Sequence, residues 1–301
     1  MSNQTNSSLD LGLSDNRKKI LEQYNSDQGI QFYQTVMGDF GFSIHYGIYE
    51  NPDESVGKAS ENVIKFMANL IDQRLSLGIG KRIVDLGSGY GGAAHHLALN
   101  YGCRVTCVNI CPDQNQVNLL QAKKLGIANL IDIVECSFED LPQDWTNQFD
   151  AVWSEEAFCH AEDKHQVIKE VNRVLKPGGI CVFSDIMRGE NVDEADTNTF
   201  SDRNAVTGLG SVSDYIAWSS SEGLKNVTYH DFTSHLGINF QKMIDQIDQF
   251  WDQMVDGSVS EEYLKQFRTS LVDRLDAFEN GSFSWGCFEI TKALDISSIS
   301  A

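Results

Sequence analysis

Three glycines, Gly87, Gly89 and Gly91, stand in the stretch IVDLGSGYGG (83–92), directly after a short apolar run and before a helix-like stretch. Backbone at such a position must turn sharply, and a ligand can approach it closely because no Cβ stands in the way. The stretch matches both G-x-G-x-G and the dinucleotide pattern G-x-G-x-x-G, so the glycines alone do not identify the ligand. A tight turn that binds nothing is the remaining alternative.

Asp85 lies two residues before the first of these glycines and discriminates between the candidate ligands. We expect its carboxylate at the carboxyl end of a strand, facing the ligand, where it would repel a pyrophosphate. A cationic amino or sulfonium group would instead be attracted. The pattern therefore favours a cofactor that carries positive charge.

Strand-like and helix-like stretches alternate through the middle of the chain. The short apolar runs predict strands at 82–86, 104–110, 131–136, 149–153 and 179–185. The stretches between them predict helices near 91–100, 113–124 and 163–175. This alternation is typical of an α/β fold with a parallel sheet and crossover helices.

Further elements are predicted on both sides of this core. Before it we expect helices at 15–37 and 55–78, and after it a polar segment at 188–210, a strand at 225–233, helices at 238–256 and 260–278, and a strand at 283–291. We predict a single domain over 1–301. It divides into an N-terminal cap (1–54), a cofactor-binding core (55–185), and a lid with the C-terminal part of the sheet (186–301).

Composition excludes several classes of partner. The formal charge of −20 argues against nucleic acid and against anionic lipid, because both require clustered positive charge. No apolar run is long enough to span a membrane, and the N-terminal residues lack the features of a secretion signal. The seven cysteines are scattered and indicate reduced thiols rather than disulfides or metal ligands. We therefore expect a cytoplasmic protein without a metal.

The motif around Asp85 resembles the first motif of class I S-adenosylmethionine-dependent methyltransferases. Later motifs of that family follow in order: Asn109 ends the second strand, Ser137-Phe138 follow the third, Phe149-Asp150-Ala-Val-Trp153 forms the fourth, and Leu175-Lys-Pro-Gly-Gly179 precedes the fifth. The resemblance implies a Rossmann-like, seven-stranded, mostly parallel sheet with helices on both faces. It also implies S-adenosylmethionine as the cofactor.

The same resemblance implies which residues hold the cofactor. In this family an Asp or Glu usually binds the ribose where Asn109 stands, and Asn offers one carbonyl acceptor and an amide donor instead. Ser137 and Phe138 resemble the positions that hold the adenine, although a strand end and a core aromatic are the alternative. The implied cofactor-binding set is Tyr33, Ser43, Asp85, Gly87, Gly89, Asn109, Ile110, Gln114, Ser137, Phe138 and Glu155.

Motifs outside the core resemble methyltransferases that act on small amines. These motifs are Gly29-Ile-Gln-Phe-Tyr33, Ser43-Ile-His-Tyr-Gly-Ile-Tyr49 and Ser284-Trp-Gly-Cys-Phe-Glu-Ile-Thr-Lys292. That group includes the glycine, sarcosine and dimethylglycine N-methyltransferases of betaine synthesis and the phosphoethanolamine methyltransferases. The resemblance implies that Tyr24 pairs with His160 to close the site and to handle a proton. A histidine with a purely structural role is the alternative.

Candidate residues for the methyl acceptor are less specific. Trp153, together with Tyr33 and Trp285, could offer an aromatic face to a methylated ammonium, although core packing explains them equally well. Arg188 or Arg203 could pair with an acceptor carboxylate, and a surface arginine is the alternative. The phosphoethanolamine enzymes place a Tyr directly after the Asp of the fifth strand. Here Ile186 follows Asp185, which argues against a phosphate pocket.

We therefore predict an N-methyltransferase for a small amino acid amine, sarcosine or dimethylglycine, on the route to glycine betaine. The expected partner is a small-molecule substrate, and homodimer formation is left open. The alternatives are a phosphoethanolamine N-methyltransferase, a sterol or tocopherol C-methyltransferase, and a non-catalytic cofactor-binding protein.

Overall fold

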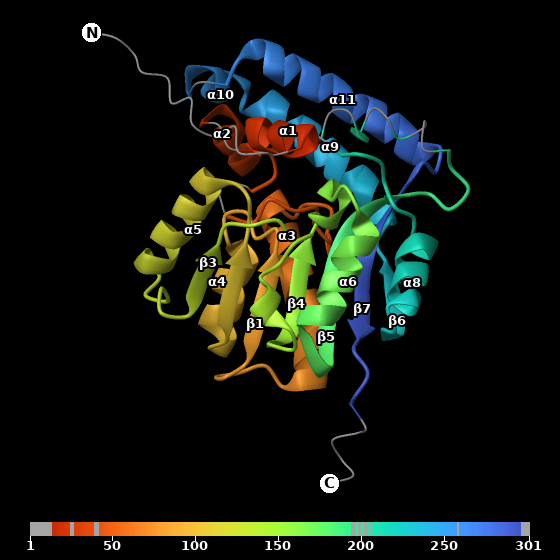
Figure 1. Cartoon of the computed structure of the whole chain (residues 1–301). Coiled ribbons are helices and arrows are strands. Elements are labelled where there is room, and N and C mark those ends of the chain that lie inside the picture. The colour runs from red at the N-terminus through yellow and green to blue at the C-terminus, as the bar shows by residue number, and fades with distance from the viewer. Residues whose placement is uncertain are drawn as a thin grey trace.

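A single seven-stranded sheet forms the centre of the molecule, with strand order β3-β2-β1-β4-β5-β7-β6 (Figure 1). The computed structural model describes residues 14–24, 27–38, 42–193, 197, 200–201, 204, 206–257 and 259–295. The strands are β1 (Arg82–Leu86), β2 (Arg104–Val108), β3 (Ile131–Val134), β4 (Phe149–Glu155), β5 (Leu175–Arg188), β6 (Lys225–Asp231) and β7 (Phe283–Thr291).

Strands β1 to β5 run parallel, and β7 pairs antiparallel with both β5 and β6. The predicted Rossmann-like, mostly parallel sheet is therefore confirmed. Strand β1 lies between β2 and β4, so the strand order reverses there. In open α/β sheets, ligands bind at the carboxyl ends of the strands next to such a reversal.

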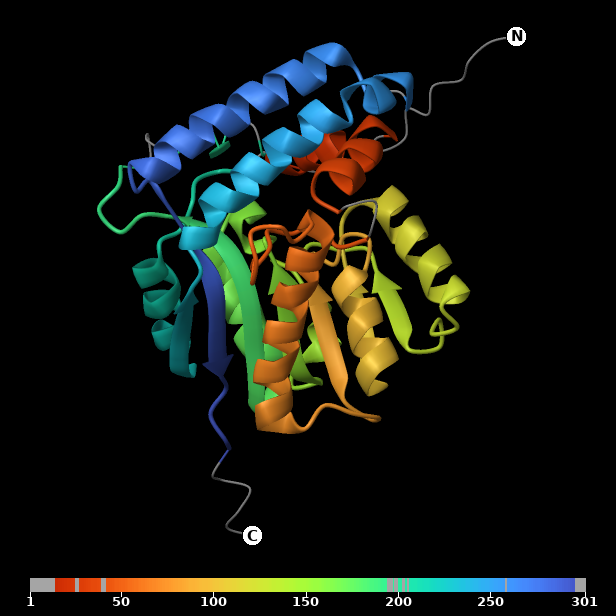
Figure 2. The same ribbon diagram turned by 180° about the vertical axis from the view of Figure 1, so that it is seen from behind.

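Helices cover both faces of the sheet (Figures 1 and 2). On one face lie α3 (Val56–Leu75), α4 (Gly92–Tyr101) and α5 (Pro112–Lys124); on the other lie α6 (Lys164–Val174) and α8 (Val212–Ser221). Each face has its own cluster of buried apolar side chains. Local sequence fixes where several helices begin: the side chains of Ser55 and Asp163 accept hydrogen bonds from the backbone of the first turns of α3 and α6.

A layer of helices lies above the carboxyl edge of the sheet, and we call it the roof (Figures 1 and 2). Its members are α1 (Asp15–Tyr24), α2 (Asp27–Val36), α9 (Ser234–Gln249), α10 (Trp251–Gly257) and α11 (Glu261–Glu279). Asn239 of α9 joins the roof to the N-terminal segment by two hydrogen bonds with the backbone of Gly47, at 2.7 and 2.9 Å.

Several predicted boundaries differ from the structure. The helix expected over 15–37 is two helices, α1 and α2, and the helix expected over 238–256 is interrupted at Phe250 between α9 and α10. Strand β5 extends to Arg188 because it stays paired with β7 up to Phe283. The division into cap, core and lid stays a prediction.

Helix α8 was not predicted at all. Ser211 and Asp214 form a capping box at its start, but only Tyr215 and Ser219 are buried along it. Such a helix has no continuous apolar stripe, so packing against α6 and β6 must stabilise it. Among the described helices, none combines the length and the apolar composition that a membrane-spanning segment requires.

Candidate active site

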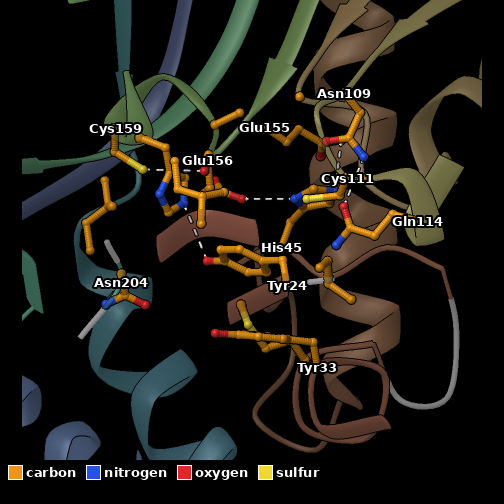
Figure 3. A pocket seen from close by; sticks show the side chains of 18 of the residues that line it. Tyr24, Tyr33, His45, Asn109, Cys111, Gln114, Glu155, Glu156, Cys159 and Asn204 are labelled. Atoms are coloured by element: carbon orange, nitrogen blue, oxygen red, sulfur yellow. Dashed lines mark hydrogen bonds and ion pairs between the residues drawn. The ribbon is translucent and has the colours of Figure 1, made fainter. Parts of the chain in front are cut away.

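A cavity lies between the carboxyl ends of the strands and the roof. Its empty space, with solvent at the mouth included, is about 1160 Å³. Many of the residues predicted from the sequence line it: Tyr24, Tyr33, Gly87, Gly89, Asn109, Ile110, Gln114, Ser137, Phe138, Glu155 and His160. Figure 3 shows part of this lining.

Other predicted residues do not line the cavity. Asp85 and Trp153 are buried behind it, and Ser43 packs against the first turn of α4, where a Cβ on Gly92 would overlap with its Oγ. Arg188 forms an ion pair with Asp214 at 2.7 Å. Arg203 lies outside the described residues. The roles predicted for these side chains stay predictions.

The glycine loop after β1 has the backbone geometry that a close ligand requires. Gly87 and Gly89 adopt positive φ angles of +81° and +51°. A Cβ on Gly87 would lie 2.3 Å from the Cβ of Ala157, whereas a Cβ on Gly89 would project into open space. The loop therefore leaves room for a ligand directly above Gly89.

Buried carboxyl groups lie at the end of the cavity next to this loop. Burial and the neighbouring Glu155 raise the pKa of Asp85 to about 8. Burial likewise raises the pKa of Glu155 to about 7, against the effect of His45, and Trp153 donates a hydrogen bond to this carboxylate at 3.1 Å. This hydrogen bond from the buried Trp153 fixes the position of the Glu155 carboxylate. A cationic ligand would favour the ionised form of both acids.

His45 lies between two glutamates, and sequence reasoning assigned it no role (Figure 3). Its Nε2 is 3.5 Å from Glu155 and its Nδ1 is 3.3 Å from Glu156. Burial alone would lower the pKa of His45, but the two glutamates outweigh burial and raise it to about 9. Glu156 adopts a positive φ of +43° and accepts a hydrogen bond from Trp285 at 2.8 Å. The lining next to the glycine loop thus includes Glu155, Glu156 and His45, and Asp85 is buried nearby.

These shifted groups predict that the protein without cofactor becomes less stable as pH rises from 6.5 to 9. The pKa values of Asp85 and His45 are higher in the folded protein than their ordinary values of 3.8 and 6.5, which apply to the unfolded chain. Both groups therefore bind a proton more tightly in the folded protein. Unfolding therefore releases protons in this range, and the free energy of unfolding falls by up to about 1.4 kcal/mol per pH unit for each proton released. Urea unfolding at pH 6.5, 7.5 and 9 measures the slope, and Asp85→Asn should make it shallower. An equal slope in this variant would contradict the prediction.

The ribose and adenine positions predicted from the sequence lie side by side along the cavity. Asn109 donates a hydrogen bond to the side-chain oxygen of Gln114 at 3.0 Å. Farther along, Ser137 accepts a hydrogen bond from Arg17 of α1 at 3.0 Å, and Arg17 also contacts Glu139 at 3.4 Å. Helix α1 is thereby held over the end of β3. The polar groups follow the order of the strands, which suits an elongated nucleoside.

Tyr24 and His160 approach each other across the cavity, from α1 and from the short helix η2 (Phe158–His160). The Tyr24 hydroxyl lies 3.4 Å from Nε2 of His160, and the ring of Tyr24 stacks on Tyr33 with a centroid distance of 4.8 Å (Figure 3). Burial raises the pKa of Tyr24 well above its usual value, so this hydroxyl stays protonated. Asn16 of α1 donates to the backbone carbonyl of His160 at 3.2 Å.

A buried carboxyl group supports the turn that carries His160. Asp185, at the end of β5, accepts hydrogen bonds from the backbone of Cys159 at 3.3 Å and from the hydroxyl of Tyr215 at 2.6 Å. Burial raises the pKa of Asp185 to about 7, against the effect of the Tyr215 hydrogen bond. Tyr215 belongs to α8, the unpredicted helix, so sequence reasoning missed this support.

Arg274 is a second residue that sequence reasoning missed. It is 1% exposed, it lines the cavity, and its guanidinium lies 4.8 Å from the ring centroid of Phe200 and 5.4 Å from that of Phe267. A signal was present in the sequence, because Phe267, Leu271 and Arg274 follow helical spacing along one face of α11. An arginine on an apolar face is unusual and indicates a function or a buried partner.

The described residues contain no group of three His, Cys, Asp or Glu side chains arranged to hold a metal ion. All seven cysteines are free thiols, and burial raises the pKa of those nearest the cavity, Cys111 to about 12 and Cys159 well above its usual value. Thiolate nucleophiles are therefore not available at neutral pH in this cavity.

The fold and the cavity together define a methyltransferase, and comparison with known proteins agrees. Residues 84–183 match the family model described as "Methyltransferase domain". The chain is 31% identical over 271 residues to the sarcosine/dimethylglycine N-methyltransferase of Halorhodospira halochloris, covering 90% of this chain and 95% of that protein. It is 36% identical to the glycine/sarcosine/dimethylglycine N-methyltransferase of Actinopolyspora halophila, covering 88% of this chain but only 46% of that longer protein.

A solved structure resembles this chain over its whole fold. The crystal structure of a putative sarcosine dimethylglycine methyltransferase from Galdieria sulphuraria superposes with a TM-score of 0.82 at 27% identity, covering 91% of this chain and all of that one. The chain belongs to the methyltransferase family that includes these enzymes. The predicted enzyme class is confirmed. Solved structures that share this fold at 17–18% identity hold S-adenosylmethionine or S-adenosylhomocysteine.

Proposed function

We propose that this protein transfers a methyl group from S-adenosylmethionine to the nitrogen of sarcosine or dimethylglycine. The observation that carries the proposal is the Tyr24–His160 pair, at 3.4 Å, in the same cavity as the glycine loop. The substrate amine must lose a proton before its nitrogen can attack the methyl group. A histidine that can take up this proton, in the same cavity as the glycine loop, suits that requirement. The names of the relatives reported above give sarcosine and dimethylglycine as their substrates.

The residues present fit the cofactor. Gly89 leaves open space above the loop, and the buried Asp85 and Glu155, together with the partly buried Glu156, suit the positive charge of the cofactor. Asn109 would hold the ribose. Ser137 and Phe138 would hold the adenine. When bound, S-adenosylmethionine supplies a methyl group on a sulfonium, which an amine nitrogen can attack in line without a metal.

The chain's own residues align the acceptor and move a proton. An acceptor ammonium passes its proton to the hydroxyl oxygen of Tyr24 as that hydroxyl passes its proton to Nε2 of His160, so the proton count balances. The nitrogen lone pair is then available. The roof excludes water from the site, and Glu155 and Glu156 stabilise the cation that the methylated amine becomes.

The acceptor is tested with purified protein, labelled S-adenosylmethionine, and glycine, sarcosine, dimethylglycine or phosphoethanolamine in parallel. We expect label in the products from sarcosine and dimethylglycine, with initial rates well above those from phosphoethanolamine. Turnover of phosphoethanolamine alone would overturn the proposal. Binding of S-adenosylhomocysteine without turnover of any amine would favour a non-catalytic protein.

A further inference from the structure

We propose that Arg274 holds the carboxylate of the methyl acceptor. This inference rests on the proposed function and names the group that recognises its substrate. Arg274 of α11 lines the cavity from the roof, whereas the glycine loop lines it from the sheet. Figures 1 and 2 show α11 above the upper ends of the strands. An acceptor bound between the two sides would have the cofactor below it and this guanidinium above it.

The orientation of the guanidinium is fixed before any ligand arrives. The rings of Phe200 and Phe267 flank it at 4.8 and 5.4 Å, and both of these residues also line the cavity. A guanidinium held against aromatic rings presents its N–H groups in a fixed plane, and this geometry matches the two oxygens of a carboxylate. Little side-chain freedom is lost on binding, which favours affinity for a small ligand.

The position of Arg274 distinguishes it from the other cationic side chains of the cavity lining. Arg17 contacts Ser137 and lies at the end of the cavity assigned to the adenine. His45 lies beside the glycine loop, between two glutamates. Arg274 lies instead in α11 of the roof, against the rings of Phe200 and Phe267. It is therefore the arginine that an acceptor, rather than the cofactor, would meet.

The charge distribution also orients an amino acid. Glu155 and Glu156 favour the amine at the sheet side, where the methyl group is delivered, and they repel a carboxylate. Arg274 attracts the carboxylate toward the roof. The cavity lining also includes the apolar side chains of Ile186 and Met243, which cannot bind a carboxylate. This arrangement selects an amine that carries an acid group over one that carries a hydroxyl.

The test compares Arg274→Met and Arg274→Lys with Arg268→Met, a control on the same helix. Arg268 is exposed and pairs with Asp248 at 2.7 Å, so its loss should leave catalysis unchanged. We expect Arg274→Met to raise the KM for dimethylglycine roughly 100-fold, because an anion in a low-dielectric site loses its partner. Arg274→Lys keeps the charge but loses the planar fork, and we expect a smaller rise. The affinity for S-adenosylhomocysteine should change less than about threefold in all three variants.

A second acceptor separates recognition from a merely structural effect. N,N-dimethylethanolamine has a hydroxyl group in place of the carboxylate of dimethylglycine. The wild-type protein should prefer dimethylglycine, and Arg274→Met should lose most of that preference. An unchanged KM for dimethylglycine, or an equal rise for both acceptors, would overturn the proposal.

Thermal unfolding and S-adenosylhomocysteine binding show whether each variant folds. Should Arg274→Met not fold, Arg274→Lys decides the question, and a wild-type KM and preference in that variant would overturn the inference. A wild-type protein that methylates neither sarcosine nor dimethylglycine contradicts the proposed function itself, so the two failures are distinguishable.

Discussion

Replacement of His160 by alanine is expected to lower kcat for sarcosine roughly 10²- to 10⁴-fold near pH 7.5, the usual range for loss of a general base. An alkyl amine resembles the lysine side chain, whose pKa is about 10.4, so nearly all of the acceptor is protonated at this pH. His160→Ala removes the imidazole nitrogen that lies 3.4 Å from the Tyr24 hydroxyl in the wild-type protein and that accepts its proton in the proposed relay. Initial rates at saturating S-adenosylmethionine measure the effect.

The pH dependence gives this prediction a distinct signature. As pH approaches 10, free amine becomes abundant in solution, and the deficit of His160→Ala should shrink. Tyr24→Phe should show the same narrowing. His165→Ala is the matched control, because His165 is a partly exposed histidine that contacts Glu222 at 2.9 Å and does not line the cavity. A kcat for His160→Ala within threefold of wild type at pH 7.5 would contradict the assignment.

Replacement of Gly89 by alanine is expected to weaken S-adenosylhomocysteine binding roughly 10- to 100-fold, because an added methyl group in a filled site typically costs about 1–3 kcal/mol. The Cβ would project into the open space of the cavity, where the cofactor is proposed to lie. Isothermal titration calorimetry measures the affinity directly and requires no knowledge of the acceptor.

Gly126→Ala separates this effect from backbone strain. Gly126 also has a positive φ, +74°, and an added Cβ there meets nothing within 4 Å, but Gly126 does not line the cavity. Both substitutions place alanine in left-handed backbone, so each should lower the free energy of unfolding by about 1–2 kcal/mol. Only Gly89→Ala should lose affinity. Equal affinities in the two variants would be evidence against a cofactor above the loop.

The central sheet was predictable because its signals are local. The apolar run at 82–86 matches β1 and the stretch at 283–291 matches β7, since short apolar runs between turn residues encode strands directly. The glycine loop was predictable for the same reason, because its turn and its contact with a ligand involve one short stretch. Helix α8 was missed because its stability depends on packing rather than on an apolar stripe.

Parallel strands explain why much of the cavity lining could be predicted. Asn109, Ser137 and Glu155 lie far apart in the sequence, but each ends or follows a strand of one parallel sheet. The family resemblance named these residues, and parallel strands explain why they meet, because such strands bring their carboxyl ends to a common edge.

The amino-acid sequence by itself determined the α/β core, the glycine loop and the class of enzyme. Only the tertiary structure placed His45 between Glu155 and Glu156, Tyr215 beneath Asp185, and Arg274 in the cavity rather than Arg188. The contacts of His45 join segments more than a hundred residues apart, the Tyr215 contact joins α8 to β5, and Arg274 reaches the cavity from the roof. Helical spacing marked Arg274 as an arginine on an apolar face, but spacing does not identify which side chains meet across layers, because the packing of one layer on another decides those contacts.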